Sequence, residues 1–340
     1  MGDERIPGKS GGFITSRDVA RRAGVSRSAV SRTFTPGTSV SPRMRERVLK
    51  AAEELGYRVN RLAQGLISER SILVGVLVAN MSAPYMSRQL EALSRALLQE
   101  GMQCLLLNAA AAEDHGISEL IDRILEFRVR AIVVMSGAPP SAIVQECLAN
   151  GVRVILVNKL IDGATTDTIL TDDMAGARLA AQRLIDDGCR RPAIISSSAG
   201  TLSLTRRTQA AAARFAEDGL TPVIWEKGTT TYETGARAAR ETLSDAGIDG
   251  AFCVTDFLAL GYLDAARTEM GRRVPEDLSV VGFDDIPQAS WGSYRMTTLR
   301  QPVDTLIAAI MRAILRDQAD TGAVHEVLPV ELVERTTTRK

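Results

Sequence analysis

The sequence predicts a small all-α head followed by a larger α/β body built on doubly wound parallel sheets. Three observations support this: a basic N-terminal segment with helix start and stop signals, a change of character at Ile72, and apolar runs that alternate with amphipathic stretches beyond it. The chain has 340 residues, of which 45% are hydrophobic. That length and composition suit a globular protein of two or three packed domains.

The charges are divided unevenly between the two parts. The chain holds 41 Lys and Arg against 41 Asp and Glu, but residues 1–71 hold 14 against 7, a net charge of +7 that leaves −7 on the rest. A basic head on an acidic body suits a nucleic-acid binder, because cations neutralise phosphates. A basic N-terminus can equally be a solvated tail, so the local pattern has to decide.

Two short helices are predicted at the start of the head. Thr15 and Asp18 have the spacing of a capping box, and Gly24 is the residue type that ends a helix in the left-handed conformation. Ser26 then caps a second helix over residues 27–33. Two helices joined by so short a turn form a helix-turn-helix.

A third helix is expected to complete the core of the head. Ser41 followed by Pro42 is a strong start signal, and Gly56 supplies the stop. Apolar side chains at helical spacing lie between them: Val48, Ala51, Ala52 and Leu55. The head therefore spans residues 14–59, after a disordered tail at 1–13.

The second helix presents polar side chains that suit DNA. Arg27, Ser28, Ser31 and Arg32 are expected on its outer surface, and a helix of this width fits the major groove. Arginine can bond a guanine edge with two hydrogen bonds, and serine can bond base edges or phosphate. The alternative is an ordinary solvated helix face.

Residues 60–71 are expected to form a hinge helix and linker. Asn60 would cap a short helix that runs through Leu66, but this helix contains Gly65. It is too short to be stable alone in water. We therefore expect it to order only against a partner.

From Ile72 the chain alternates between strand and helix patterns. Apolar runs of the kind buried on both faces of a parallel sheet alternate with amphipathic stretches such as 86–100 and 117–127. The runs form two series: 72–79, 104–107, 131–135 and 152–157, then 193–195, 221–225, 251–254 and 278–283. Two doubly wound lobes are predicted, with ligands at the carboxyl ends of their strands.

Three stretches of the head occur in a diagnostic order. They are TSRDVARRAGVSRSAVSR from Thr15 to Arg32, then Val40-Ser41, then GYRVNRLA from Gly56 to Ala63. This pattern resembles the lactose/galactose repressor family of bacterial transcription regulators. In that family the first two positions of the recognition helix read bases, and the hinge helices of two subunits pair in the minor groove, where a leucine is wedged between base pairs.

The resemblance implies a homodimer on pseudo-palindromic operator DNA. Thr35, Gly65 and Ile67 depart from the family, which usually has asparagine, serine and arginine there, so the pattern of hinge contacts is less closely matched than the helix-turn-helix. The implied DNA contacts are Thr15, Ser16, Ser26, Arg27, Ser28, Ser31, Arg32, Asn60, Ala63 and Leu66.

The body resembles the effector domain of the same family, which is similar to periplasmic sugar-binding proteins. The matching stretches are LTDDMAGA (170–177), DGCRRPA (187–193), TDFLALG (255–261), VPEDLSVVGFDD (274–285) and TTLRQP (297–302). In that domain the chain crosses between the lobes more than once. The body, 72–340, is therefore divided into lobe one at about 72–169 and 302–323 and lobe two at about 170–301 and 324–338.

Two charged residues are expected to face the cleft between the lobes. Asp256 follows a buried strand and Arg207 begins a helix after another. An arginine and a carboxylate can grip vicinal hydroxyls, since one donates and the other accepts. On the residues alone, Asp256 could instead be a helix cap and Arg207 a surface salt bridge.

The resemblance implies ligand contacts at both positions, and therefore a sugar-like effector. Further contacts are expected at Met81, Ser82, Tyr85 and Asp173, with Tyr85 able to stack on a sugar face. Ala210, Ala211 and Thr230 stand where relatives have glycine or an aromatic, which favours a smaller or more charged ligand than a hexose.

Other classes of protein lack their usual signals. The chain has two histidines and four cysteines without a CxxC pair. It contains no GxGxxG after Val78 and no GxxxxGK[ST], HExxH or GxSxG motif. These features argue against an enzyme, a cofactor or a metal site. The pair Asp284-Asp285 matches a structural stretch of the family and is not expected to be catalytic. A secreted binding protein is disfavoured because no signal peptide precedes the basic head. No run reaches the roughly 18 apolar residues of a membrane span, so a cytoplasmic protein is expected.

Overall fold

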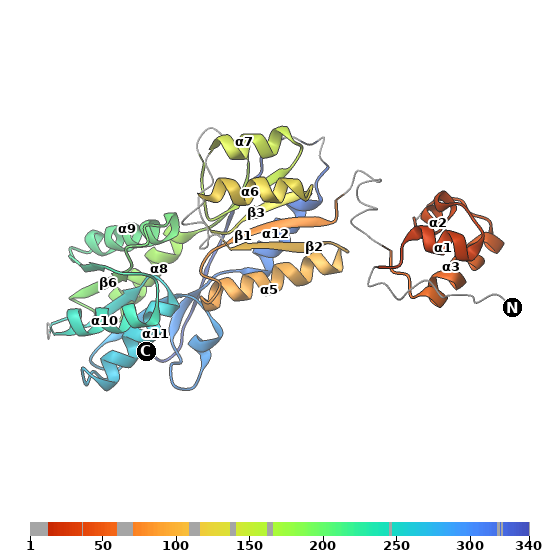
Figure 1. The fold of residues 1–340 in the computed structure, drawn as a ribbon. Coiled ribbons are helices and arrows are strands. Elements are labelled where there is room, and N and C mark those ends of the chain that lie inside the picture. The colour runs from red at the N-terminus through yellow and green to blue at the C-terminus, as the bar shows by residue number, and fades with distance from the viewer. Residues whose placement is uncertain are drawn as a thin grey trace. The chain divides into compact units, whose positions relative to one another are not determined.

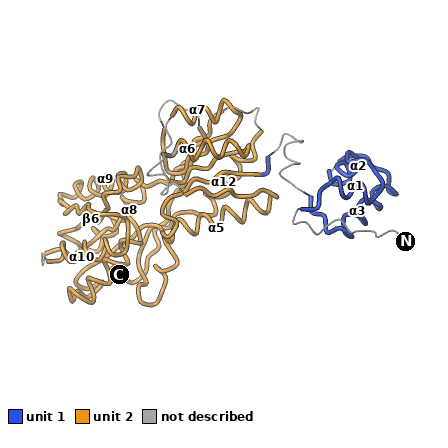
Figure 2. The backbone as a smooth tube through the Cα atoms, in the orientation of Figure 1, with its two compact units in different colours: residues 1–72 blue, residues 73–340 orange. Residues whose placement is uncertain are grey.

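The structure is a computed structural model that describes residues 13–35, 37–59, 71–108, 116–136, 141–161, 166–244, 247–317, 320 and 322–339. The chain divides into two compact units, Met1–Ile72 and Leu73–Lys340 (Figure 2). The first is all-α and the second α/β, so the predicted fold class is confirmed. The predicted hinge helix, with Asn60, Ala63 and Leu66, lies outside the described residues.

Three helices form the described part of the head: α1 (Ser16–Ala23), α2 (Arg27–Phe34) and α3 (Pro42–Leu55) (Figure 1). At the start of α1, the Asp18 carboxylate accepts hydrogen bonds from the amide and hydroxyl of Thr15, at 3.0 and 2.7 Å. This helix ends at Gly24, whose φ of 61° is left-handed and suits glycine. Ser26 Oγ accepts from the Ala29 amide at 3.2 Å, which starts α2.

A small apolar core holds these helices together. Val19, Val30 and Val48 come from the three helices in turn, and each is at most 1% exposed. Burying one such side chain contributes roughly 1.5–3 kcal/mol. Arg47 of α3 donates to the carbonyl oxygens of Ala23 and Gly24, which lack partners inside α1. Core and cap together fix α2 against the other two helices.

The described part of the body contains two six-stranded sheets. The first has the order β11-β5-β4-β3-β1-β2 and is parallel: β1 (Leu73–Val78), β2 (Gln103–Asn108), β3 (Ala131–Val134), β4 (Arg153–Val157), β5 (Asp167–Thr171) and β11 (His325–Leu328). The second has the order β12-β10-β9-β8-β6-β7: β6 (Pro192–Ser196), β7 (Val223–Glu226), β8 (Gly250–Cys253), β9 (Ser279–Asp284), β10 (Thr297–Arg300) and β12 (Glu331–Val333). In the second sheet, β12 runs antiparallel to β10.

Helices cover both sheets (Figure 1). Those of the first sheet are α5 (Pro84–Gln99), α6 (Gly116–Glu126), α7 (Ser141–Ala149) and α12 (Val303–Leu315). Those of the second are α8 (Asp173–Asp186), α9 (Leu202–Glu217), α10 (Tyr232–Leu243) and α11 (Asp256–Thr268), with a 3-10 turn η2 (Pro287–Ser290). We call the first sheet and its helices lobe one, and the second sheet and its helices lobe two.

The apolar strands are buried on both faces, as the sequence predicts. Successive side chains of a strand point to opposite faces, so β1 contributes to two cores. Val74 and Val76 pack with residues of α5 and α12, whereas Leu77 packs with residues of α6 and α7. A strand that is buried on both faces needs a continuous apolar run, which is the pattern seen in the sequence.

The lobe boundary near the C-terminus differs from the prediction. We expected residues 324–338 in lobe two, but β11 pairs with β5 in lobe one, with His325 opposite Thr168 and Leu328 opposite Thr171. Only β12 joins the second sheet. The prediction was wrong because β11 is a four-residue edge strand, His-Glu-Val-Leu, without an apolar run to mark it.

Helices α10 and α11 approach each other closely at two glycines. A Cβ built on Gly235 would lie 1.9 Å from the carbonyl oxygen of Leu258, and one on Gly261 would lie 1.9 Å from that of Tyr232. Both obstacles are backbone atoms, which cannot turn aside as a side chain can. Lobe two therefore depends on the absence of a side chain at these positions.

We expect Gly235→Ala to lower the free energy of unfolding by at least about 1–3 kcal/mol, because the helices must move apart. Urea denaturation followed by circular dichroism measures this. Gly292→Ala is the control, since its Cβ would meet nothing within 4 Å. Equal stabilities of the two variants would contradict the close approach.

Candidate functional site

The outer face of α2 carries the candidate DNA-contacting side chains. Ala29, Val30 and Thr33 are buried, so the opposite face is open. Arg27 makes no hydrogen bond or ion pair within the described part of the chain, and its guanidinium is therefore available. Of the described candidates, the exposed ones are Thr15, Ser26, Arg27, Ser28 and Arg32, and the half-buried ones are Ser16 and Ser31.

Local hydrogen bonds hold part of this face. The hydroxyl oxygens of Ser26 and Ser28 lie 2.9 Å apart, at hydrogen-bond distance. Arg32 Nε donates to the carbonyl oxygen of Ser28 at 3.4 Å, one helical turn back. These contacts restrict the side chains before any ligand arrives, which reduces the entropy lost on binding.

The described head also keeps a surplus of cations. Arg22 pairs with Glu54 at 2.7 Å. Four further basic side chains are exposed and form neither an ion pair nor a hydrogen bond with a described residue: Arg17, Arg43, Lys50 and Arg58. Such free cations attract phosphates without regard to sequence.

A buried polar cluster lies where strands of lobe two end. Its centre is Arg207 of α9, which is 3% exposed. Arg207 Nε donates to Asp173 Oδ1 at 2.7 Å, and Nη1 donates to the Val254 carbonyl oxygen at 2.8 Å and to Asp284 Oδ1 at 3.3 Å. The guanidinium carbon lies 3.6 Å from the ring centroid of Phe283. Val254 and Asp284 stand at the carboxyl ends of β8 and β9, the usual ligand position in such sheets.

Gln301 connects this cluster to lobe one. Its Oε1 accepts from the Tyr85 hydroxyl at 2.8 Å and from Thr171 Oγ1 at 2.9 Å, and its Nε2 donates to Asp284 Oδ1 at 2.6 Å. Three of the predicted site residues, Tyr85, Asp173 and Arg207, are thereby brought together through Asp284 and Gln301.

Neither Asp284 nor Gln301 was predicted as a ligand contact. Asp284 stands at the carboxyl end of a buried strand, which is the rule that selected Asp256, so this signal was available. Gln301 carried no signal of its own, because its role depends on partners from β5, α5 and β9 that are far away in the sequence.

The structure places Asp256 differently from the prediction. We expected its carboxylate to face the cleft, but Asp256 is fully buried. Its Oδ1 accepts from Thr298 Oγ1 at 2.5 Å and its Oδ2 accepts from the Ile286 amide at 2.9 Å. Thr255, not Asp256, caps α11 through the Leu258 amide. The carboxylate therefore holds β10 and the turn after β9.

Met81 and Ser82 also stand apart from the cluster. Met81 packs against the lobe-one core, and the exposed Ser82 donates to Asn80 Oδ1 at 3.1 Å. No hydrogen bond joins either of them to Arg207 or its partners within the described part of the chain.

Burial perturbs both aspartates near this site. Burial and the neighbouring Asp284 raise the pKa of Asp256 well above its usual range. Burial also raises the pKa of Asp284, although Arg207 and Gln301 oppose the shift by stabilising its charged form. Both carboxylates therefore hold a proton more tightly than an exposed aspartate does.

We expect Asp256→Asn to flatten the pH dependence of stability. An unfolded aspartate titrates near pH 4, at about 3.9, so the folded state holds the Asp256 proton more tightly and stability is lost as pH rises through the folded pKa. An asparagine can accept from the Ile286 amide with its oxygen and donate to Thr298 Oγ1 with its nitrogen, so both contacts remain without this loss. Relative to wild type, the variant should gain about 1 kcal/mol or more between pH 5 and 8, measured by urea denaturation.

The exposed Asp122→Asn is the matched control, because Asp122 lies on the surface of α6. If Asp256→Asn and Asp122→Asn show the same pH dependence as wild type, burial does not control the protonation of Asp256.

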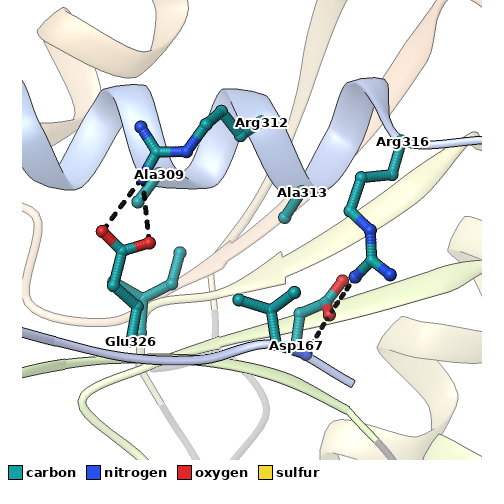
Figure 3. A pocket seen from close by; sticks show the side chains of 8 residues that line it. Asp167, Ala309, Arg312, Ala313, Arg316 and Glu326 are labelled. Atoms are coloured by element: carbon teal, nitrogen blue, oxygen red, sulfur yellow. Dashed lines mark hydrogen bonds and ion pairs between the residues drawn. The ribbon is translucent and has the colours of Figure 1, made fainter. Parts of the chain in front are cut away.

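A separate hollow of about 240 Å³ lies in lobe one, between α12 and strands β5 and β11. Figure 3 shows that two ion pairs frame it: Arg312 with Glu326 at 2.9 Å, and Arg316 with Asp167 at 3.0 Å. Ala313 lines the wall between them. Its charged side chains satisfy one another, so this hollow offers no free charge to a ligand.

The head and the body together define a class of protein: a DNA-binding regulator with a two-lobed α/β domain. Residues 15–60 match the family described as bacterial regulatory proteins, lacI family, and residues 181–338 match the periplasmic binding protein-like domain. The transcriptional regulator GalS of Salmonella typhimurium is 31% identical over 95% of this chain and 96% of its own length. The regulator CelR of Thermobifida fusca is 31% identical over 94% of each chain.

Solved structures give the same result. A lac repressor dimer bound to operator and the anti-inducer ONPF matches with a TM-score of 0.85 and 25% identity, over 97% of this chain and 100% of that one. A CelR–cellobiose complex matches with a TM-score of 0.70 and 28% identity, over 95% and 99%. This chain belongs to the LacI family of bacterial regulatory proteins. It is a transcription regulator and not an enzyme.

Among the helices of the described residues, none has the length and apolar character needed to span a membrane.

Proposed function

We propose that this chain is a dimeric, cytoplasmic repressor. Its α2 helices read the two halves of a pseudo-palindromic operator, and a small polar effector in the cleft beside Arg207 sets the operator affinity. The observation that carries the proposal is the buried cation Arg207, held between Asp173 and Asp284 at the strand ends of lobe two and linked by Gln301 to Tyr85 of lobe one. A site built across two lobes is one that a ligand can use to set their angle.

The proposed DNA contacts follow the chemistry of α2. Arg27 is free to bond a guanine edge, while Ser28 and Arg32 add further polar contacts on the same face. Dimerisation doubles the few base pairs that one helix reads. By resemblance, Asn60, Ala63 and Leu66 add the minor-groove contacts. The related lac repressor dimer is bound to its operator, which supports this assignment.

The proposed effector is a hydroxyl-rich small molecule. Arg207 supplies donors, and Asp173 and Asp284 supply acceptors, so the set matches neighbouring hydroxyls on a sugar or polyol. Asp284, and not the predicted Asp256, is the proposed acceptor for the ligand, because both oxygens of Asp256 already have protein partners. The related CelR structure holds cellobiose, a sugar.

We expect Arg27→Ala to lose discrimination at one base pair per half-site, by about 1–3 kcal/mol, if Arg27 makes a bidentate base contact. An operator is first selected from randomised duplexes with wild-type protein, and each variant is then titrated on the operator and on single-base variants of it. The control is Lys50→Ala, which removes the same charge from the exposed side of α3.

Lys50→Ala should keep the wild-type ranking of sequences. Uniform weakening by Arg27→Ala across all duplexes would make Arg27 a phosphate contact, and the proposed base reading would be wrong.

We expect one of a panel of neutral sugars, polyols, nucleosides and sugar phosphates to raise the melting temperature and to change operator affinity. A ligand at 100 times its Kd stabilises by about 2.7 kcal/mol, so thermal shift detects it. Arg207→Lys should bind the operator normally and lose this shift, because lysine keeps the charge but not the planar fork. If that variant keeps wild-type affinity for the ligand, or if no compound binds, the cleft assignment fails.

A further inference from the structure

The start of α5, in lobe one, makes two contacts toward lobe two: one with Gln301, in a link between the lobes, and one with Asp285 of lobe two. The Tyr85 hydroxyl donates to Gln301 Oε1 at 2.8 Å, and Arg88 Nη1 donates to the carbonyl oxygen of Asp285 at 3.2 Å. Residues three apart lie on the same side of a helix, so the two contacts act side by side. Both contacts end beside Asp284. Gln301 donates to the Asp284 carboxylate at 2.6 Å, and Asp285 is the next residue in the chain.

The turn that α5 contacts is strained. Asp284 has a φ of 135° and Asp285 a φ of 52°, in a region that side chains other than glycine rarely adopt. Such residues cost about 1–3 kcal/mol each and persist only when their surroundings hold them. Here the holding groups are side chains: Arg207 and Gln301 on Asp284, and Arg300 and Arg335 on Asp285 at 2.7 and 2.6 Å.

Gln89, one helical turn beyond Tyr85, offers a second partner. It is 2% exposed, and its Nε2 has no hydrogen-bond partner within the described part of the chain. An unsatisfied buried donor costs about 1–3 kcal/mol. Burial raises the pKa of Tyr85 and the Gln89 side chain lowers it, so the Gln89 amide already lies beside the Tyr85 hydroxyl in this state.

We propose that the first turn of α5 is a latch between the lobes. In the latched state, Tyr85 and Arg88 hold lobe one against the turn that carries Asp284. When the lobes part, the Tyr85 hydroxyl no longer donates to Gln301, while its oxygen can still accept from Gln89 Nε2. Tyr85 is thus a positioning residue whose bond to Gln301 exists only in the latched state. A ligand that engages Asp284 competes with Gln301 for that carboxylate and shifts the latch.

Only that last step rests on the proposed effector site. The latch itself is a property of the protein without ligand, so it is tested without one. The distance between the lobes is measured in the full chain by pulsed electron paramagnetic resonance, with spin labels on Glu119→Cys of α6 and Gln209→Cys of α9. Cys104→Ser removes the half-buried thiol, and the other three cysteines are buried. The labelled protein is mixed with an excess of unlabelled chain, so that a dimer holds at most one labelled subunit and only distances within that subunit are measured.

The matched pair of variants is Tyr85→Phe and Tyr294→Phe. Each removes one hydroxyl that donates at 2.8 Å, but Tyr294 donates to Asp264 inside lobe two and does not reach lobe one. We expect Tyr85→Phe to move the mean distance by more than about 2 Å or to add a second population, as a released hinge does. Tyr294→Phe should leave the wild-type distribution unchanged.

Arg88→Ala removes the second contact and should shift the distribution in the same direction as Tyr85→Phe. Wild-type distances in both Tyr85→Phe and Arg88→Ala would overturn the latch. The two proposals can fail separately. If Tyr85→Phe and Arg88→Ala shift the distances but Arg207→Lys still binds the effector normally, the latch stands and the effector site is wrong.

Discussion

The arrangement of lobe two depends on one buried cation. Removing an arginine from water is costly, and much of the cost is recovered when charged groups and carbonyl oxygens accept from its donors. Arg207 achieves this with two carboxylates, a carbonyl and an aromatic face, and these partners come from α8, β9 and the residue after β8. A chain that satisfies Arg207 must therefore bring three strand and helix ends to one place. The same requirement that fixes the fold also builds the polar site.

Much of the fold was readable because its signals are local. A continuous apolar run such as β1 needs no knowledge of its neighbours, and helix caps such as Thr15 and Ser26 act within four residues. The strands that lacked such runs were not predicted. Thr297 and Thr298 of β10 are fully buried, yet their hydroxyls are satisfied by Thr338 and Asp256, which are about 40 residues away. Buried polar strands of this kind become intelligible only with their distant partners.

The site shows the same division. Arg207 was selected as the start of a helix after a strand, although α9 begins earlier, at Leu202, and Asp173 was implied by the family resemblance. The structure brings the two side chains within 2.7 Å. The choice between Asp256 and Asp284 could not be made in the same way, because each aspartate adjoins the carboxyl end of a buried strand. What separates them is which carboxylate meets the guanidinium and which meets a backbone amide, and that depends on tertiary packing.

The short connections between the lobes have a mechanical consequence. The chain crosses from one sheet to the other three times within the described residues: at Asp172 between β5 and α8, at residues 301–302 between β10 and α12, and at residues 329–330 between β11 and β12. Each crossing has only one or two residues, so none can stretch. Three inextensible links permit rotation about an axis near all of them and resist sliding and twisting. Gln301 lies in one of these links, so a small rotation of the lobes changes its hydrogen bonds before it disturbs either core.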